Sequence, residues 1–195
     1  MAKIHYMGKY SGNPDDLPTQ TYREGSVKFK EPETMKKLAI IANIGALIVA
    51  VFTLGLFYLR GGIGMFGNFG IPVGFLLVVV TMLPHEYLHA ICFKEEVYVY
   101  TNLKQGLLFV VGPEAMTKGR FIFMSMLPNL VFGFIPYILY MIWPNLVVLG
   151  ALGALAIPAG FGDYMNVFNA ATQMPKGALT YLYKTNSYWF MPKEA

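Results

Sequence analysis

Charged residues are scarce in this chain of 195 residues, and residues 121–162 contain none at all. Asp, Glu, Lys and Arg together make up 13% of the chain, whereas a soluble domain has about 25%. Hydrophobic residues make up 55%, and they occur in long blocks rather than in the amphipathic stripes of a soluble helix. The composition therefore excludes an ordinary soluble domain and a disordered chain.

Cysteine and histidine are also rare. Cys92 is the single cysteine, so no intrachain disulfide can form. The three histidines are His5, His85 and His89. We expect three histidines to be too few for the di-iron sites of membrane hydroxylases and desaturases.

Four apolar runs have the length of about 20 residues that a helix needs to cross a bilayer. They cover residues 38–59, 71–93, 121–143 and 146–170, with Pro144-Asn145 as the turn between the last two. The first run follows a tail of 37 mostly polar residues, so we interpret it as an uncleaved helix and not as a signal peptide. The predicted fold class is an all-α membrane protein with about four transmembrane helices.

The remaining segments are short. Asn13-Pro14 and Leu17-Pro18 interrupt regular structure in the N-terminal tail. The middle loop, 94–120, has two β-prone runs on either side of Lys104-Gln105-Gly106, which predicts a short β-hairpin between the second and third helices. We divide the chain into an N-terminal tail (1–37), a membrane domain (38–175) and a C-terminal tail (176–195).

Basic residues indicate the orientation. Fourteen of the fifteen lie in the two tails and the middle loop, and Arg60 alone lies on the opposite side. By the positive-inside rule both termini and the middle loop face the cytoplasm. The net charge of +4 follows from this topology, so we expect a multi-pass protein in contact with the lipid bilayer and no nucleic-acid partner.

Four ionisable side chains lie inside the predicted spans: His85, Glu86, His89 and Asp163. Such groups are costly at membrane depth and are usually functional. The first three form the pattern H-E-x-x-H, in which the two imidazoles lie about 40° apart on a helix and can bind one metal ion, with the glutamate placed as a general base. The alternative is a hydrogen-bonded cluster that only packs helices.

A catalytic zinc ion takes three protein ligands. Asp163 is the favoured third ligand, because the glycines and proline of residues 158–162 should loosen its helix; a carboxylate facing water at the helix end is the alternative. Cys92 lies one turn beyond His89 and is the second candidate, although an apolar helix also uses cysteine for packing.

Asn129 and Asn166 are polar residues in the third and fourth spans. They can orient a substrate or donate to an oxyanion, or they can simply bridge helices. His85, Asn129 and Asp163 all lie about 10–12 Å from the cytoplasmic end of their spans. Three spans thus place polar groups at one level, as a shared site requires.

The segment Leu83-Pro84-His85-Glu86-Tyr87-Leu88-His89-Ala90 resembles the active-site helix of bacterial zincin-type membrane peptidases, small multi-span proteins related to the site-2 proteases. The resemblance covers most of the chain, including residues 29–33, the middle loop, 162–166 and 174–178. It implies that His85, His89 and Asp163 hold zinc and that Glu86 is the base. Glycine precedes Asp163 here, whereas the site-2 pattern has glycine after the aspartate.

The motif and the resemblance together predict a zinc-dependent intramembrane metalloendopeptidase in a bacterial cell membrane. It would hydrolyse peptide bonds of membrane-associated protein or peptide substrates near the cytoplasmic face. The middle-loop hairpin either pairs with the substrate as an added strand or covers the site. A membrane protein that binds metal for a regulatory purpose without proteolysis is the alternative, and the lack of inverted repeats disfavours a transporter.

Overall fold

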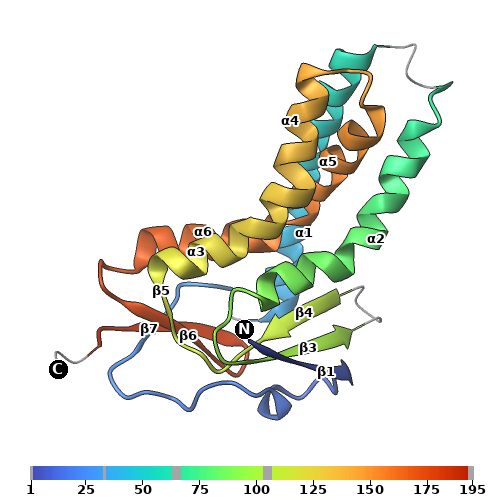
Figure 1. The fold of residues 1–195 in the computed structure, drawn as a ribbon. Coiled ribbons are helices and arrows are strands. Elements are labelled where there is room, and N and C mark those ends of the chain that lie inside the picture. The colour runs from blue at the N-terminus through green and yellow to red at the C-terminus, as the bar shows by residue number, and fades with distance from the viewer. Residues whose placement is uncertain (1, 33, 63–66, 103–106, 193–195) are drawn as a thin grey trace. The chain divides into compact units, whose positions relative to one another are not determined.

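The computed structural model describes residues 2–32, 34–62, 67–102 and 107–192 (Figure 1). The chain is mostly helical and forms two compact units. The helical unit comprises Pro32–His85 and Met126–Met165. The sheet unit comprises Met1–Glu31, Glu86–Ser125 and Asn166–Ala195.

Three helical stretches are long and apolar enough to cross a membrane. They are α1 (Met35–Gly61), α2 (Gly70–Ala90) and a third stretch in which α3 (Lys118–Pro128), the π-helical turn η4 (Asn129–Phe134) and α4 (Ile135–Ile142) follow one another without a break. These stretches correspond to the first three expected spans. They are compatible with a multi-pass membrane protein.

The fourth expected span is not one straight helix. It is a pair, α5 (Val147–Ala159) and α6 (Phe161–Gln173), bent by 53° at Gly160. Pro158 lies inside α5 and has no N–H to continue the helical hydrogen bonding, so the helix is weakest there. The described residues therefore contain three candidate spans, or four if the bent pair counts as one.

Helix α5 packs against both α1 and α4 in the helical unit (Figure 1). Its small residues allow the close approach: a Cβ on Gly150 would lie 2.4 Å from Tyr140 Cγ and 2.6 Å from Phe57 Cε2. Tyr140 is fully buried and donates its hydroxyl hydrogen to the Phe57 carbonyl at 3.0 Å. Large apolar side chains on α1 point outward instead, as lipid contact requires; they include Ile44, Leu47, Ile48, Val51 and Phe52.

The first sheet of the sheet unit has three strands in the order β1-β3-β4. The middle loop supplies β3 (Glu96–Asn102) and β4 (Leu107–Val111), which pair antiparallel, as expected for the predicted hairpin. Its predicted turn at 104–106 lies outside the described residues. The N-terminal tail adds β1 (Lys3–Lys9), which runs parallel to β3.

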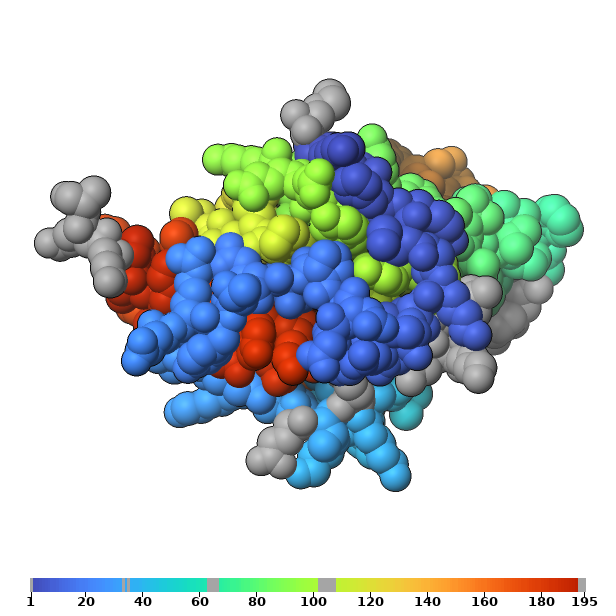
Figure 2. Space-filling view, turned by 90° about the horizontal axis from the view of Figure 1, so that it is seen from below, coloured from blue at the N-terminus to red at the C-terminus, as the bar shows by residue number. Residues whose placement is uncertain are grey.

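The second sheet corrects the expected all-α class. It has four strands in the order β2-β7-β6-β5: β2 (Val27–Lys28), β7 (Asn186–Phe190), β6 (Leu179–Tyr183) and β5 (Met116–Thr117). Figure 2 shows the N-terminal segment lying beside and over these C-terminal strands. The all-α prediction was incomplete for two reasons. Both tails pair with partners that are distant in sequence, which local hydrophobic periodicity does not report, and the local hairpin of β6 and β7 was not recognised in the C-terminal tail.

Helix α2 ends at Ala90, before the predicted limit of its span. Ala90 and Phe93 instead belong to a buried cluster with Val97 and Met116. Since a cluster of this kind replaces water by apolar contact, it fixes the end of α2 within the sheet unit. The predicted metal-binding motif lies in this last part of α2.

Candidate metal centre

The last two turns of α2 carry the H-E-x-x-H motif. The potential ligand atoms of His85, Glu86 and His89 all lie within 4.8 Å of one another. His89 is buried, and the other two side chains are half-buried. The helix thus brings together the group that the residue spacing predicts.

His89 is held by a hydrogen bond that determines its tautomer. Its Nδ1 lies 2.9 Å from the backbone carbonyl oxygen of Met124 in α3. A carbonyl can only accept, so Nδ1 carries the hydrogen and donates it. In the neutral form of the ring the lone pair is then on Nε2, and metal-binding histidines are commonly oriented by a bond of this kind.

Asp163 meets His85 within the helical unit. Its Oδ2 lies 3.3 Å from His85 Nε2. Two ligands of a tetrahedral zinc ion are separated by about 3.3–3.4 Å when each metal–ligand distance is about 2.0–2.1 Å. Asp163 also lies in the first turn of α6, where the positive end of the helix dipole favours a carboxylate. The pair therefore fits two positions of a zinc site.

Asn129 contacts Asp163. Its Nδ2 donates to Asp163 Oδ2 at 2.7 Å, and its side chain is 2% exposed. Three roles were open for Asn129: substrate orientation, an oxyanion contact or a bridge between helices. The hydrogen bond to Asp163 is a bridge between η4 and α6. Asn166 lies half-buried in α6, one turn beyond Asp163.

Cys92, the second candidate for the third ligand, lies two residues beyond the end of α2. Its Sγ donates to the Leu88 carbonyl oxygen at 3.3 Å. Burial raises the pKa of the Cys92 thiol, although the nearby Arg120 acts in the opposite direction. Of the two candidates for the third ligand, Asp163 contacts His85, and neither belongs to the group whose ligand atoms all lie within 4.8 Å of one another.

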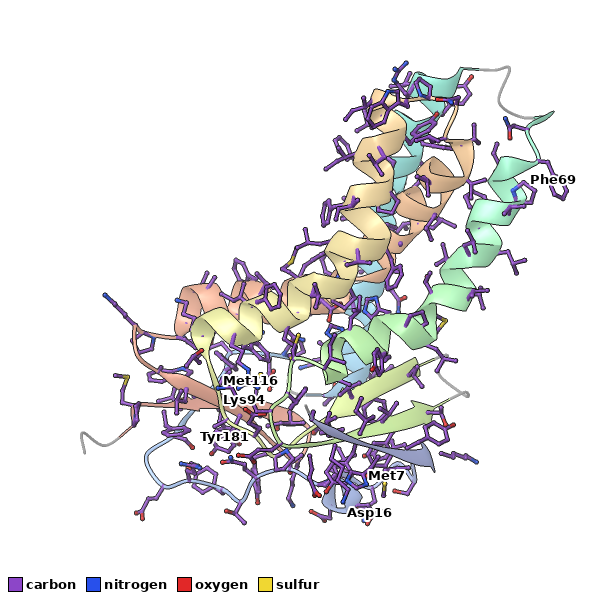
Figure 3. The ribbon with its side chains drawn as sticks, in the orientation of Figure 1. Met7, Asp16, Phe69, Lys94, Met116 and Tyr181 are labelled. Atoms are coloured by element: carbon purple, nitrogen blue, oxygen red, sulfur yellow. The ribbon has the colours of Figure 1, made fainter. Side chains whose placement is uncertain are left out.

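Sequence reasoning missed a set of interactions between Arg120, Glu114 and the backbone after α2. We call this set the Arg120–Glu114 clamp. Arg120 forms an ion pair with Glu114 and donates from Nη2 and Nε to the Cys92 carbonyl oxygen at 2.7 and 3.0 Å. Glu114 in turn accepts from the backbone N–H of Lys94, labelled in Figure 3, at 2.6 Å. Arg120 lies at the end of an apolar run, and the sequence analysis used its charge only as evidence for the orientation in the membrane.

The electrostatics of Glu114 follow from this clamp. Burial acts to raise the pKa of Glu114, but hydrogen bonds from Arg120 and from the Lys94 backbone outweigh it and leave the pKa below its ordinary value. Glu114 is thus an ionised group that fastens the chain just after the motif helix.

Comparison with known proteins agrees with this chemistry. A family model described as "Putative zincin peptidase" matches residues 78–179, just over half of the chain. The matched range contains His85, Glu86, His89, Asn129 and Asp163. No curated protein and no solved structure matches the chain.

Proposed function

The chain belongs to the family described as putative zincin peptidases, and on this premise we propose that it is a zinc-dependent intramembrane endopeptidase of the site-2-protease-like type. The family implies zinc and metallopeptidase activity. The observation that carries the finer proposal is the H-E-x-x-H group at the end of an apolar helix that is long enough to span a membrane.

We assign His85, His89 and Asp163 as the residues that hold zinc. The Nε2 lone pair of His89 and the 3.3 Å separation of His85 Nε2 and Asp163 Oδ2 support this set. Zinc in such a site lowers the pKa of water toward neutrality and polarises a peptide carbonyl.

Glu86 is the general base of the proposed reaction. It takes a proton from the attacking water as the new bond to the peptide carbon forms, and it returns that proton to the amine as the carbon–nitrogen bond breaks. The neighbouring position of Glu86 and His85 on α2, within the group that spans 4.8 Å, supports this role.

The substrates we propose are membrane-associated proteins or peptides cleaved near the cytoplasmic face. Support comes from the sheet unit, where both tails and the middle loop share strands: β1 pairs with β3, β2 with β7, and β5 with β6. Segments that pair in this way lie on the same side of a membrane, as the basic residues also indicate. Together they support one shared side for both termini and the middle loop, which we propose is the cytoplasmic face of a bacterial cell membrane.

An extended substrate can pair with the edge strand β4. In the described part of the chain β3 is flanked by both β1 and β4, whereas β4 pairs with β3 alone. Added strands bind through such unpaired backbone groups. We therefore assign the substrate-pairing role of the hairpin to β4.

The proposal is tested on purified protein in mild detergent. Zinc per chain is measured for the wild type and for His85→Ala, Asp163→Ala and Glu86→Gln, with fluorescently labelled β-casein as the unstructured substrate. We expect about one zinc ion per chain in the wild type and in Glu86→Gln, and loss of zinc in the other two variants. Cleavage should fall by about 10²- to 10⁴-fold in Glu86→Gln.

His5→Ala is the matched control, because His5 lies in β1 of the N-terminal tail. It should retain both zinc and cleavage. Zinc binding with equal β-casein signals in the wild type and Glu86→Gln would favour the regulatory, non-proteolytic alternative. A wild type that takes up no zinc would refute the metallopeptidase proposal.

A further inference from the structure

We propose that Asn129 is the positioning residue of the metal centre, and that Gly160 leaves the space that the Asn129 side chain needs. Asn129 would hold the Asp163 carboxylate in the orientation that presents it to the metal. This inference rests on the proposed function, since it concerns the third ligand of the same site. It assigns to Asn129 a role that differs from substrate or oxyanion contact.

Two side chains converge on one oxygen atom of Asp163. Asn129 Nδ2 donates to Oδ2 at 2.7 Å, and His85 Nε2 lies 3.3 Å from the same Oδ2. A carboxylate can rotate about its side-chain bonds, and a hydrogen bond from a buried donor restricts that rotation. Groups that contact ligands in this way tune metal affinity, and their loss costs about 10- to 100-fold in affinity.

Gly160 touches the other end of the Asn129 amide. A Cβ at position 160 would lie 1.5 Å from Asn129 Oδ1 and 2.5 Å from its Cγ. The backbone at Gly160 has φ −78°, a conformation that any residue adopts. The glycine is therefore required by the space that the Asn129 side chain occupies, and not by the local conformation.

The backbone on the Asn129 side is also specialised. Asn129 begins the π-helical turn η4, in which the Ile135 N–H donates to the Leu130 carbonyl five residues earlier. Pro136 follows and has no N–H of its own. A π-helical turn inside a helix is frequent at functional sites, and here it sets the position of a buried amide.

The Asp163 side is fixed by the break between α5 and α6. The Asp163 N–H donates to the Gly160 carbonyl oxygen at 3.0 Å, closing the turn that starts α6. Gly160 thus contacts Asn129 and starts the turn that carries Asp163. Gly160 therefore links the two side chains in two ways. It packs against the Asn129 amide, and its carbonyl oxygen accepts the hydrogen bond that starts the turn carrying Asp163.

The experiment compares two changes that disturb Asn129 in different ways. Asn129→Ala removes the amide, whereas Gly160→Ala keeps the amide and displaces it. Gly162→Ala is the matched control, because a Cβ at Gly162 meets nothing within 4 Å. Zinc affinity is measured by competition with a chromophoric chelator in detergent, and the melting temperature of each metal-free protein is recorded beside it.

We expect zinc affinity to fall by about 10- to 100-fold in Asn129→Ala and in Gly160→Ala, and to stay at the wild-type value in Gly162→Ala. Asp163→Ala should lose zinc on purification but keep weak binding through His85 and His89, which zinc titration measures. In that background Asn129→Ala should cause no further loss of affinity, because the carboxylate it positions is gone. This dependence on Asp163 is a signature that a merely structural asparagine would not produce.

Three results would overturn the inference. Asn129→Ala with unchanged zinc affinity and a lower melting temperature would make Asn129 a packing residue only. An equal loss of affinity with and without Asp163 would show that Asn129 acts on the site independently of Asp163. A wild type without zinc would remove the proposed function and this inference together, whereas absent β-casein cleavage with the expected zinc pattern would leave the inference standing.

Discussion

The clamp between Arg120 and Glu114 should be a principal determinant of stability in the sheet unit. Arg120→Met removes the guanidinium and keeps an unbranched apolar side chain of similar length. The change deletes the ion pair with Glu114 and the two hydrogen bonds to the Cys92 carbonyl. It leaves the Glu114 carboxylate, which is 7% exposed, without its cation.

The magnitude follows from burial. Removing one partner of a fully buried ion pair costs about 3–5 kcal/mol. The Arg120–Glu114 pair is partly buried, with Arg120 21% exposed, so we expect the smaller cost of about 1.5–3 kcal/mol that hydrogen bonds to charged groups show. For a protein of this size each kcal/mol corresponds to about 2–4 °C in melting temperature. We therefore expect Arg120→Met to melt about 3–12 °C below the wild type at pH 7.

The effect should depend on pH with a defined sign. The folded pKa of Glu114 is below its ordinary value of 4.5, so ionised Glu114 contributes stability above that value. The contribution is lost as the pH falls through the folded pKa. The difference in melting temperature between the wild type and Arg120→Met should therefore shrink as the pH is lowered below 4.5.

Thermal unfolding in detergent, followed by intrinsic tryptophan fluorescence, measures this difference at pH 7 and in acid. Glu114→Gln and the double variant complete a double-mutant cycle, in which the coupling should reach about 0.5–3 kcal/mol. Equal melting temperatures for the wild type and Arg120→Met at pH 7, or additive effects in the cycle, would refute the clamp.

Two further predictions concern packing and a second carboxylate. Gly150→Ala should destabilise the helical unit by about 1–3 kcal/mol, since its Cβ would overlap Tyr140. Gly55→Ala should instead stabilise α1 by about 0.5–1 kcal/mol, because a Cβ there meets nothing within 4 Å. Denaturant unfolding that ranks the two variants the other way would contradict both predictions. Burial raises the pKa of Glu31 despite a 2.9 Å hydrogen bond from the Ser187 N–H. The stability that this group contributes therefore falls as the pH rises through its folded pKa. Glu31→Gln should melt higher than the wild type at pH 7 and lose that advantage at pH 4. A variant that melts lower than the wild type at pH 7 would refute the raised pKa of Glu31.

Local sequence patterns predicted the helices that are long and apolar enough to cross a membrane and the group that could hold a metal ion. An apolar run of about 20 residues has few alternatives to a spanning helix, and the i, i+4 spacing of His85 and His89 places both imidazoles on one face of any helix. The glycines and proline between 158 and 162 also indicated the weak point at which α5 and α6 separate. Each of these features depends on neighbours within a turn or two, which is the range that sequence periodicity reports.

Pairing over long sequence distances was decided only by the tertiary structure. The strands β1 and β2 come from a mostly polar tail, and their partners β3 and β7 begin 93 and 159 residues further along the chain. Strand pairing depends on which edges the fold brings together, so the all-α expectation failed there.

The same distinction holds at the metal centre. The identity of Glu86 as a base candidate and of Asp163 as a ligand candidate could be read from residue type and predicted depth. The contact of Asn129 with Asp163, the space beside Gly160 and the clamp of Arg120 on Glu114 could not. A polar side chain in a membrane helix can face several neighbours, and only the packing of the helices determines which of them it meets.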